Sequence, residues 1–449
     1  MTSIMWFRRD LRLRDNPALR AATKSGPVLG LFVLDPVLWR AGGPARRAWL
    51  AANLRSLSES MDGRLCIRMG SPASLVASMA REVDATQVHV SNDPFPYARK
   101  RDQAVVDALP DGVEGVATGT PYAVEPGTIR NGSGDPYKVF TPFSRAWREH
   151  GWDDPVPAPR NLEWLEHESD QRVEAMLDKA LADAPDGMPT PGEDAAHRRW
   201  RAFLDRDITD YDSTRDDPGA DRTSRLSAYL KLGVVHPRQL LHEIAGTKGK
   251  GAHTWETEIA WREFYADVLH HQPASAWSDL RPVAGLDYDE PTDAIEAWKT
   301  GHTGFPIVDA GMRQLLAEGW MHNRVRMITA SFLTKDLHVW WPVGARHFLD
   351  HLVDGDLASN NHGWQWVAGT GTDAAPYFRV FNPITQGVKF DATGDYVRRW
   401  VPELAHLSGK SVHEPWDAED GYDHDYPRRI IDHKEERQRA LDRYQRGRD

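Results

Sequence analysis

Short apolar runs alternate with helical patterns along the first part of the 449-residue chain. The runs are brief, rich in β-branched residues and bounded by turn residues, as buried strands are. They cover residues 4–7, 28–34, 65–69 and 88–90, with helical spacing at 45–59 and 73–83. This alternation predicts an α/β fold, a doubly wound parallel sheet with helices on both faces. Ligands of such sheets bind beyond the carboxyl ends of the strands.

The pattern changes after residue 150. Residues 151–192 are rich in proline, glycine and aspartate, which is typical of a long surface connection. From residue 195 onward the helical period dominates. We therefore predict an α/β domain over residues 1–128, a connection over 129–194 and an all-α domain over 195–449. The last thirty residues are highly charged, which predicts a solvated helix or a frayed tail.

Cysteine usage and hydropathy limit the class of protein. The single cysteine, Cys66, excludes a disulfide framework, and no cysteine and histidine cluster has the spacing of a zinc site. Charged residues follow the first few positions, and no apolar run is long enough to span a bilayer. These features predict a cytoplasmic protein with no metal and no membrane contact. Nothing indicates an additional interface, so we expect a monomer.

The net charge of −11 is unevenly distributed. Residues 1–50 carry a net +6, whereas residues 151–200 and 251–300 each carry −7. An acidic protein is a poor indiscriminate DNA binder, because such binding scales with the number of phosphates that its cations neutralise. A nucleic-acid site on this chain would therefore have to be local.

The most informative local motif is TSRLSAYLKLG at residues 223–233. Hydroxyl side chains at the start of a helix can cap it, and the free N–H groups there can bind an anion. The motif is therefore either a phosphate cradle or an ordinary capped helix.

A second motif lies on a predicted helix at residues 255–265. With about 100° per residue, Trp255, Glu258, Trp261 and Arg262 share an arc of roughly 120°. Buried charges are costly unless they are paired, so a carboxylate and a guanidinium among tryptophans form a poor hydrophobic stripe. This face is either an aromatic pocket with a polar anchor or a structural ion pair at a helix junction.

A third motif brackets a glycine with Asp354 and Asp356. This pattern suggests a metal loop or a helix cap. No further oxygen ligands follow at the spacing of a calcium loop, so we predict no metal here.

Together these motifs resemble the photolyase/cryptochrome family. The similarity runs from WFRRDLRLRDNP at 6–17 through 223–233, 255–265, 304–313, 320–327 and 354–386, with TGTDAAPYFR at 370–379. It is collinear from residue 1 to about residue 404. The resemblance implies an antenna-pigment domain followed by a helical FAD-binding catalytic domain.

Within the family, the chain most resembles the class I cyclobutane pyrimidine dimer photolyases, which are carbon–carbon lyases. This implies light-driven DNA repair, in which excited reduced FAD gives an electron to a lesion flipped out of the duplex. The alternatives are a cryptochrome-like blue-light photoreceptor and a (6-4) photolyase. Asn360 stands where some cryptochromes carry aspartate, and Asn323 stands where (6-4) enzymes carry histidine. Both residues favour repair of cyclobutane dimers in UV-damaged DNA.

By the same resemblance, a set of residues is expected to hold one FAD. It comprises Tyr211, Thr223, Ser224, Arg225, Leu226, Ser227, Trp255, Glu258, Arg262, Asn323, Arg326, Asp354, Asp356 and Asn360. Arg326 is the expected partner of Asp354. Cationic and amide donors suit a reduced flavin, because the reduced ring is anionic.

A further set is expected to contact the lesion and its DNA: Arg215, Trp261, Arg324, Met327, Trp366, Arg379 and Gln386. Glu258 and Asn323 are expected catalytic residues. Glu258 can donate a hydrogen bond to a thymine carbonyl only when it is protonated, so we expect burial to raise its pKa.

Trp364 and Trp341 match the first two members of the family's electron relay, and Tyr288 stands where the third tryptophan is usual. We hypothesise that Tyr288 or the nearby Trp340 completes the relay. Residues 92–102 lack the Asn-Glu pair of folate-type members, which slightly favours a deazaflavin antenna over methenyl-folate. An empty antenna site and a plain strand-to-helix loop are the alternatives.

Overall fold

A computed structural model describes residues 1–160, 162–283, 286–374 and 379–446. The chain forms two compact units. The first comprises residues 1–184, 188–209 and 224–273, and the second comprises 185–187, 210–223 and 274–449. Ala375 to Phe378 of the TGTDAAPYFR motif lie outside the described residues. The boundaries predicted at residues 128 and 194 remain predictions.

The first unit is built on a five-stranded parallel sheet in the order β3-β2-β1-β4-β5. Its strands are β1 (Thr2–Phe7), β2 (Val28–Leu34), β3 (Leu65–Met69), β4 (Ala85–Val90) and β5 (Glu114–Ala117). β2 is buried along its whole length, as a central parallel strand must be. The fold class and the four predicted strands are confirmed. β5 was not predicted, because this edge strand is short and largely exposed and carries no apolar run.

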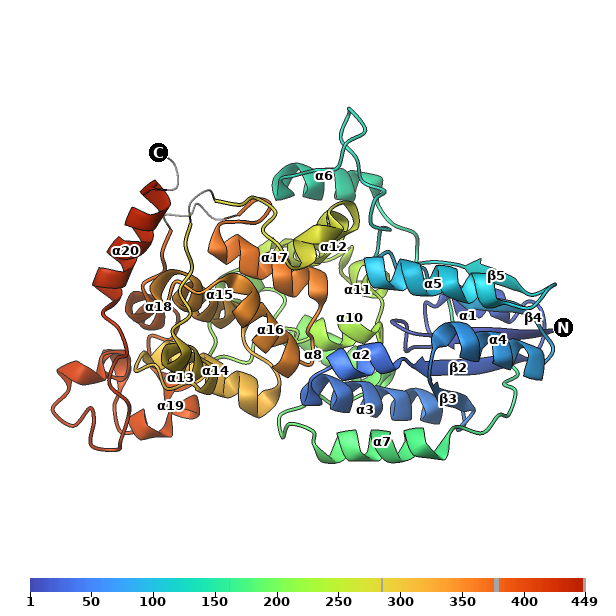
Figure 1. Ribbon diagram of the computed structural model, residues 1–449, viewed down its shortest axis with the longest axis horizontal. Coiled ribbons are helices and arrows are strands. Elements are labelled where there is room, and N and C mark those ends of the chain that lie inside the picture. Colours follow the sequence, from blue (N-terminus) through green and yellow to red (C-terminus); the bar gives the residue numbers. More distant parts are fainter. Residues whose placement is uncertain (161, 284–285, 375–378, 447–449) are drawn as a thin grey trace. The chain divides into compact units, whose positions relative to one another are not determined.

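Helices cover the sheet from both sides, with α5 above it and α3 and α7 below it in Figure 1. The helices of the first unit are α1 (Pro17–Ala22), α2 (Pro36–Ala41), α3 (Pro44–Ser60), α4 (Pro72–Glu82), α5 (Pro96–Ala108), α6 (Phe140–His150), α7 (Gln171–Ala182), α8 (Glu193–Arg206), α10 (Ser227–Leu232), α11 (Pro237–Ile244) and α12 (Lys250–His271).

The predicted connection contains a helix that the composition obscured. Asp170 caps α7 by accepting a hydrogen bond from the backbone N–H of Arg172. Val173, Leu177 and Ala180 are buried on one helix face. The abundant proline, glycine and aspartate around α7 masked this short amphipathic pattern.

The second unit shows no β-strand in its described part. Its helices are α9 (Tyr211–Thr214), α13 (Thr292–Thr300), α14 (Pro306–Glu318), α15 (Asn323–Ser331), α16 (Trp341–His351), α17 (Leu357–Ala368), α18 (Pro383–Phe390), α19 (Asp395–Trp400) and α20 (His433–Arg446). Short helices are η1 (Pro273–Ala276), η2 (Phe332–Asp336, a π-turn), η3 (Pro402–Leu404), η4 (Gly409–His413) and η5 (Pro415–Asp417). Their apolar faces enclose one core that includes Trp298, Met312 and Leu333.

The charged C-terminal segment forms α20, which packs against η2. His433 contacts Asp336, and His338 contacts Glu436 at 2.7 Å. The segment is therefore a docked helix with buried residues at its N-terminal and central turns. No helix in the described part of the chain is both long and apolar enough to cross a membrane.

Candidate functional site

The chain has an unusual backbone conformation just before α10. Arg225 has a φ of 49°, a left-handed backbone conformation that residues other than glycine rarely adopt. Leu226 follows in the right-handed region and occupies the N-cap position without a side-chain cap. Adjoining left- and right-handed residues turn successive N–H groups toward one side, where they can bind an anion. The residue at the N-cap position makes no side-chain cap, and the phosphate cradle remains a prediction.

Side chains from two other helices hold this turn in place. The indole N–H of Trp255 donates to Ser224 Oγ at 3.2 Å, and Arg199 Nε donates to the Ser224 carbonyl at 3.1 Å. The Trp255 ring in turn packs on Trp200, with ring centroids 4.5 Å apart. Arg199 and Trp200 were not singled out from the sequence, because only the fold brings α8 to this turn.

Arg262 lies in a cage of carbonyl oxygens and an aromatic ring. Its Nη2 is 3.2 Å from the Pro121 carbonyl oxygen and 3.4 Å from that of Leu230, and its Cζ lies 4.3 Å over the Tyr122 ring. Its Nη1 is 3.5 Å from Glu263 Oε1. The structure thus shows an ion pair on this part of α12.

Glu263 is the buried acid of α12. It accepts hydrogen bonds from the backbone N–H groups of Ala123 (2.9 Å) and Val124 (3.0 Å). Burial raises its pKa to about 7, against the lowering effect of Arg262 and the backbone donors. Sequence reasoning missed Glu263, because its partners lie 140 residues away. Glu258 is only half-buried, and its raised pKa remains a prediction.

Trp261 is fixed by aromatic neighbours. It stacks on Phe140 of α6 with a centroid distance of 3.6 Å and an interplanar angle of 7°, and it also packs against Tyr265. The ring is half-buried, so it is both rigid and accessible, as a wall of a binding pocket should be.

In the second unit, Arg326 and Asp354 form an ion pair at 2.9 Å. Arg326 Nε also donates to the Met321 carbonyl at 2.8 Å, so both ends of the guanidinium are oriented. The Asp354 carboxylate is buried, which strengthens the pair by excluding water. An oriented cation of this kind can stabilise negative charge on a bound ring.

Asp356 and Asn360, at the start of α17, make different hydrogen bonds. Asp356 caps the helix by accepting from the N–H groups of Ala358 and Ser359, both at 3.1 Å. Asn360 donates through Nδ2 to the Ala345 carbonyl at 3.1 Å, which fixes the orientation of its amide. In the described ranges, no group of three or more histidine, cysteine or acidic side chains is placed to hold a metal ion.

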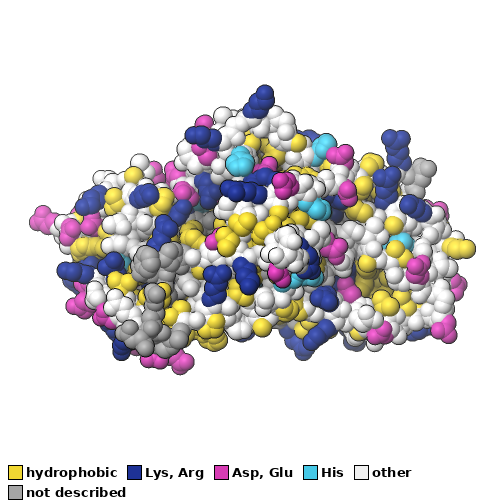
Figure 2. All heavy atoms as spheres, turned by 90° about the horizontal axis from the view of Figure 1, so that it is seen from above, with side chains coloured by type: hydrophobic (Ala, Val, Ile, Leu, Met, Phe, Trp, Pro, Cys, Tyr) yellow, Lys and Arg dark blue, Asp and Glu magenta, His cyan; other side chains and the backbone are white. Residues whose placement is uncertain are grey.

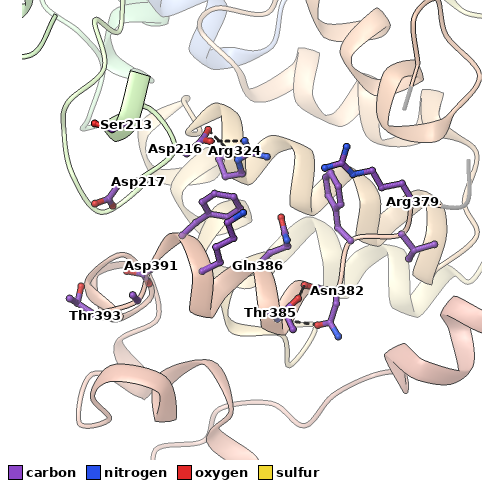
Figure 3. Close-up of a pocket in the computed structure, with 15 residues that line it drawn as sticks. Ser213, Asp216, Asp217, Arg324, Arg379, Asn382, Thr385, Gln386, Asp391 and Thr393 are labelled. Atoms are coloured by element: carbon purple, nitrogen blue, oxygen red, sulfur yellow. Dashed lines mark hydrogen bonds and ion pairs between the residues drawn. The ribbon is translucent and has the colours of Figure 1, made fainter. Parts of the chain in front are cut away.

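A pocket of about 770 Å³ opens in the second unit between the loop after α9, α15 and α18. Figure 3 shows Arg324, Arg379 and Gln386 projecting into it from different sides.

The other predicted site residues differ in their exposure. Asn323 is exposed at the start of α15, and Arg215 pairs with Asp216 at 3.8 Å. Met327 and Trp366 are half-buried against the core. In the first unit, Leu226 is buried and Ser227 is exposed. In the second unit, Tyr211 is buried and Thr223 is half-buried.

The aromatic rings of Trp341, Trp340 and Tyr288 follow one another from the core of the second unit to its surface. Trp364 and Trp341 are buried, and the Trp341 indole N–H donates to Asp279 at 2.6 Å. The next ring, Trp340, has its centroid 6.5 Å from that of Trp341 and 6.3 Å from that of Tyr288. Trp340 and Tyr288 are 38% and 37% exposed, so both rings reach solvent.

The loop that carries Tyr288 is held by α20. Arg443 donates to the Asp287 carbonyl at 3.0 Å and to the Asp289 carboxylate at 2.6 Å. That the charged tail holds this loop could not be predicted from the sequence, because the two segments are more than 150 residues apart.

Residues 92–102 form a strand-to-helix loop and the first turns of α5. Charged groups at this carboxyl edge of the sheet pair with each other: Arg8 with Asp102, and Arg9 with Asp93 at 3.6 Å. Trp6 has the guanidinium of Arg8 over its ring at 4.8 Å. These side chains occupy the edge where a sheet-bound pigment would lie.

Comparisons with known proteins agree with these features. Residues 3–160 match the family described as DNA photolyase, and residues 255–446 match the FAD binding domain of DNA photolyase. The deoxyribodipyrimidine photo-lyase of Streptomyces griseus is 42% identical over 98% of this chain and 99% of its own length.

Two solved structures share the fold over nearly their whole length. A bacterial class III photolyase from Agrobacterium tumefaciens gives a TM-score of 0.90 at 36% identity, covering 100% of this chain and 98% of that one. An archaeal photolyase from Sulfolobus tokodaii with two FAD molecules gives 0.85 at 26% identity, covering 99% and 100%. The chain belongs to the DNA photolyase family.

Proposed function

We propose that this protein is a deoxyribodipyrimidine photo-lyase, an FAD enzyme that splits cyclobutane pyrimidine dimers in DNA under blue light. The observation that carries the proposal is the 42% identity, over nearly the full length of both chains, to an enzyme of that name. The strained turn at Arg225 and the oriented Arg326–Asp354 pair supply the kinds of donor that a flavin nucleotide needs.

FAD fits the donors that each unit offers. In the first unit, the N–H groups around Arg225 suit phosphate oxygens, with Trp255 and Arg262 as further contacts. In the second unit, Arg326, Asp354 and Asn360 suit the polar edge of the flavin ring. When bound and reduced, FAD supplies one-electron transfer on excitation by light. We assign Tyr211, Thr223, Ser224, Leu226, Ser227, Glu258, Asn323 and Asp356 to the same cofactor.

The lesion requires apolar walls and a hydrogen-bond donor. We assign Trp261, Trp366 and Met327 to the walls, because flipped-out bases are held by aromatic and soft apolar contacts. Protonated Glu258 donates to a carbonyl oxygen of the dimer, and Asn323 lies exposed beside the DNA-binding residues. Arg215, Arg324, Arg379 and Gln386 bind the DNA strand.

The acidic balance of the chain does not exclude a local DNA-binding site. Lysine and arginine side chains are interspersed with acidic ones on the face seen in Figure 2, so the net charge of −11 does not describe that face. With FAD bound, Trp364 and Trp341 would relay electrons toward it from Trp340 or Tyr288.

An antenna pigment of the deazaflavin type would have to bind at the carboxyl edge of the sheet. The Arg8–Asp102 and Arg9–Asp93 pairs lie at that edge and would border the pigment. The proposed repair does not require an antenna. We further propose that the protein is a monomer and that it is cytoplasmic, since its single cysteine is free and buried and suits a reducing compartment.

The test combines cofactor state with light. Protein carrying reduced FAD is incubated with dimer-containing DNA in blue light and in darkness, and dimers are counted. We expect loss of dimers only in the light and only with reduced FAD. Persistence of the dimers with flavin bound and reduced would overturn the proposal and favour a photoreceptor.

A further inference from the structure

An ion pair defines one wall of the 770 Å³ pocket. Arg324 donates from Nε to Asp216 Oδ1 at 3.2 Å and from Nη2 to Asp216 Oδ2 at 2.8 Å. Figure 3 shows the two side chains joined in this way. Asp216 therefore occupies the side edge of the guanidinium with both of its oxygens.

The guanidinium is also fixed across its face and at its backbone. Its Cζ lies 4.4 Å over the ring of Phe390, and the Arg324 N–H donates to His322 Nδ1 at 3.2 Å. The side chain is only 17% exposed. Among the residues that the structure describes, Nη1 has no hydrogen-bond partner. The outer end of the guanidinium, formed by Nη1 and the second hydrogen of Nη2, is therefore available to donate hydrogen bonds.

The rest of the pocket suits an anion with oxygen atoms. Arg379 and Lys389 add two cations, and amides and hydroxyls come from Asn382, Gln386, Thr385, Thr393 and Ser213. Three carboxylates also line the pocket, and two of them accept hydrogen bonds from backbone N–H groups. Asp217 accepts from Gly219 N–H at 2.9 Å, and Asp391 accepts from Tyr396 N–H at 3.0 Å.

We propose that Asp216 is a positioning residue for DNA: it holds the side edge of Arg324 so that the outer end of the guanidinium meets a backbone phosphate. The inference rests on the proposed function and assigns Asp216 no contact with DNA. An arginine binds phosphate through a planar fork, so its orientation decides the strength of the contact.

Simple electrostatics and the positioning role predict opposite changes in DNA affinity when Asp216 is removed. A carboxylate near DNA repels phosphates, so removing it should strengthen binding if repulsion is its only effect. If Asp216 orients Arg324, removing it should weaken binding instead.

The experiment measures fluorescence anisotropy of labelled duplexes, with and without one cyclobutane dimer, against holoenzyme in darkness over a range of salt. For Asp216→Ala we expect about tenfold weaker binding and a salt slope reduced by about one phosphate contact. The control, Asp212→Ala, removes the same charge from an exposed position in the same segment. It should bind as tightly as the unaltered protein or more tightly.

A double-mutant cycle isolates the orientation effect. In an Arg324→Ala background, Asp216→Ala should no longer weaken binding tenfold, because the oriented guanidinium is gone and Asp216 keeps only its repulsion of phosphate and its longer 3.8 Å pair with Arg215. Asp216→Asn keeps one acceptor oxygen, so it should lose less affinity for DNA than Asp216→Ala. If the alanine variant loses its flavin spectrum, the asparagine variant takes its place in the test.

Either of two results would overturn the inference: Asp216→Ala matching Asp212→Ala, or the same effect with and without Arg324. If the unaltered holoenzyme does not prefer the dimer-containing duplex and does not repair it, the proposed function fails instead.

Discussion

Two glutamates on α12 show how position, rather than residue type, sets the behaviour of a carboxyl group. Glu263 faces the backbone of residues 123–124 and has a pKa raised to about 7 by burial. Glu258, five residues earlier, is half-buried near the stacked Trp261. The spacing on the helix identified the face of Glu258 from the sequence. It did not identify Glu263, whose partners are brought to it by the fold.

Substitution of Glu258 tests its role as a hydrogen-bond donor. Glu258→Ala should keep the flavin spectrum and lower the yield of dimer repair by about tenfold, because one hydrogen bond to charge developing on the dimer is lost. Glu258→Gln still carries N–H donors, so its yield should lie between those of the alanine variant and the unaltered protein. Equal losses for both variants would show that donation is not what Glu258 contributes.

The exposed end of the aromatic row tests which residue ends the relay. Oxidation of tyrosine ordinarily requires loss of its proton, so a tyrosine terminus should make light-driven flavin reduction depend on pH. We expect Tyr288→Phe to reduce the yield of flavin reduction and abolish any pH dependence, measured by flavin absorbance. If Trp340→Phe has this effect and Tyr288→Phe has none, Trp340 is the terminus.

At the scale of helices and strands, the sequence predicted elements whose own side chains make the pattern. The buried strands β1 to β4 and the helices α3 and α4 are of this kind. The edge strand β5 and the helix α7 were missed, because one lacks an apolar run and the other lies among helix-breaking residues. The left-handed Arg225 has no sequence signal at all, since its strain is imposed by the structure around it.

The contact between α12 and residues 123–124 should make stability depend on pH. The pKa of Glu263 rises from 4.5 to about 7 on folding, so between these values the folded protein keeps a proton that the unfolded chain has lost. Its contribution to stability therefore falls as pH rises through this window. Urea unfolding of Glu263→Gln should show a smaller decline in unfolding free energy from pH 5 to 7. Identical pH dependence in both proteins would contradict this assignment.

At the scale of the whole molecule, ordered motifs carried more information than composition. The net charge and the cysteine count excluded classes of protein but pointed to no reaction. The motifs from residue 6 to residue 386 pointed to a flavin, and both family matches agree. The sequence could not show that Asp216 reaches Arg324 or that α20 holds the loop of Tyr288, because these contacts join segments more than 100 residues apart.

The most direct test compares two lesions in one sequence. Oligonucleotides that differ only in carrying a cyclobutane dimer or a (6-4) product are illuminated with the reduced holoenzyme, and restored pyrimidines are quantified chromatographically. We expect restoration of the cyclobutane dimer in blue light, none in darkness, and none of the (6-4) product. Restoration of the (6-4) product instead, or of neither lesion, would contradict it.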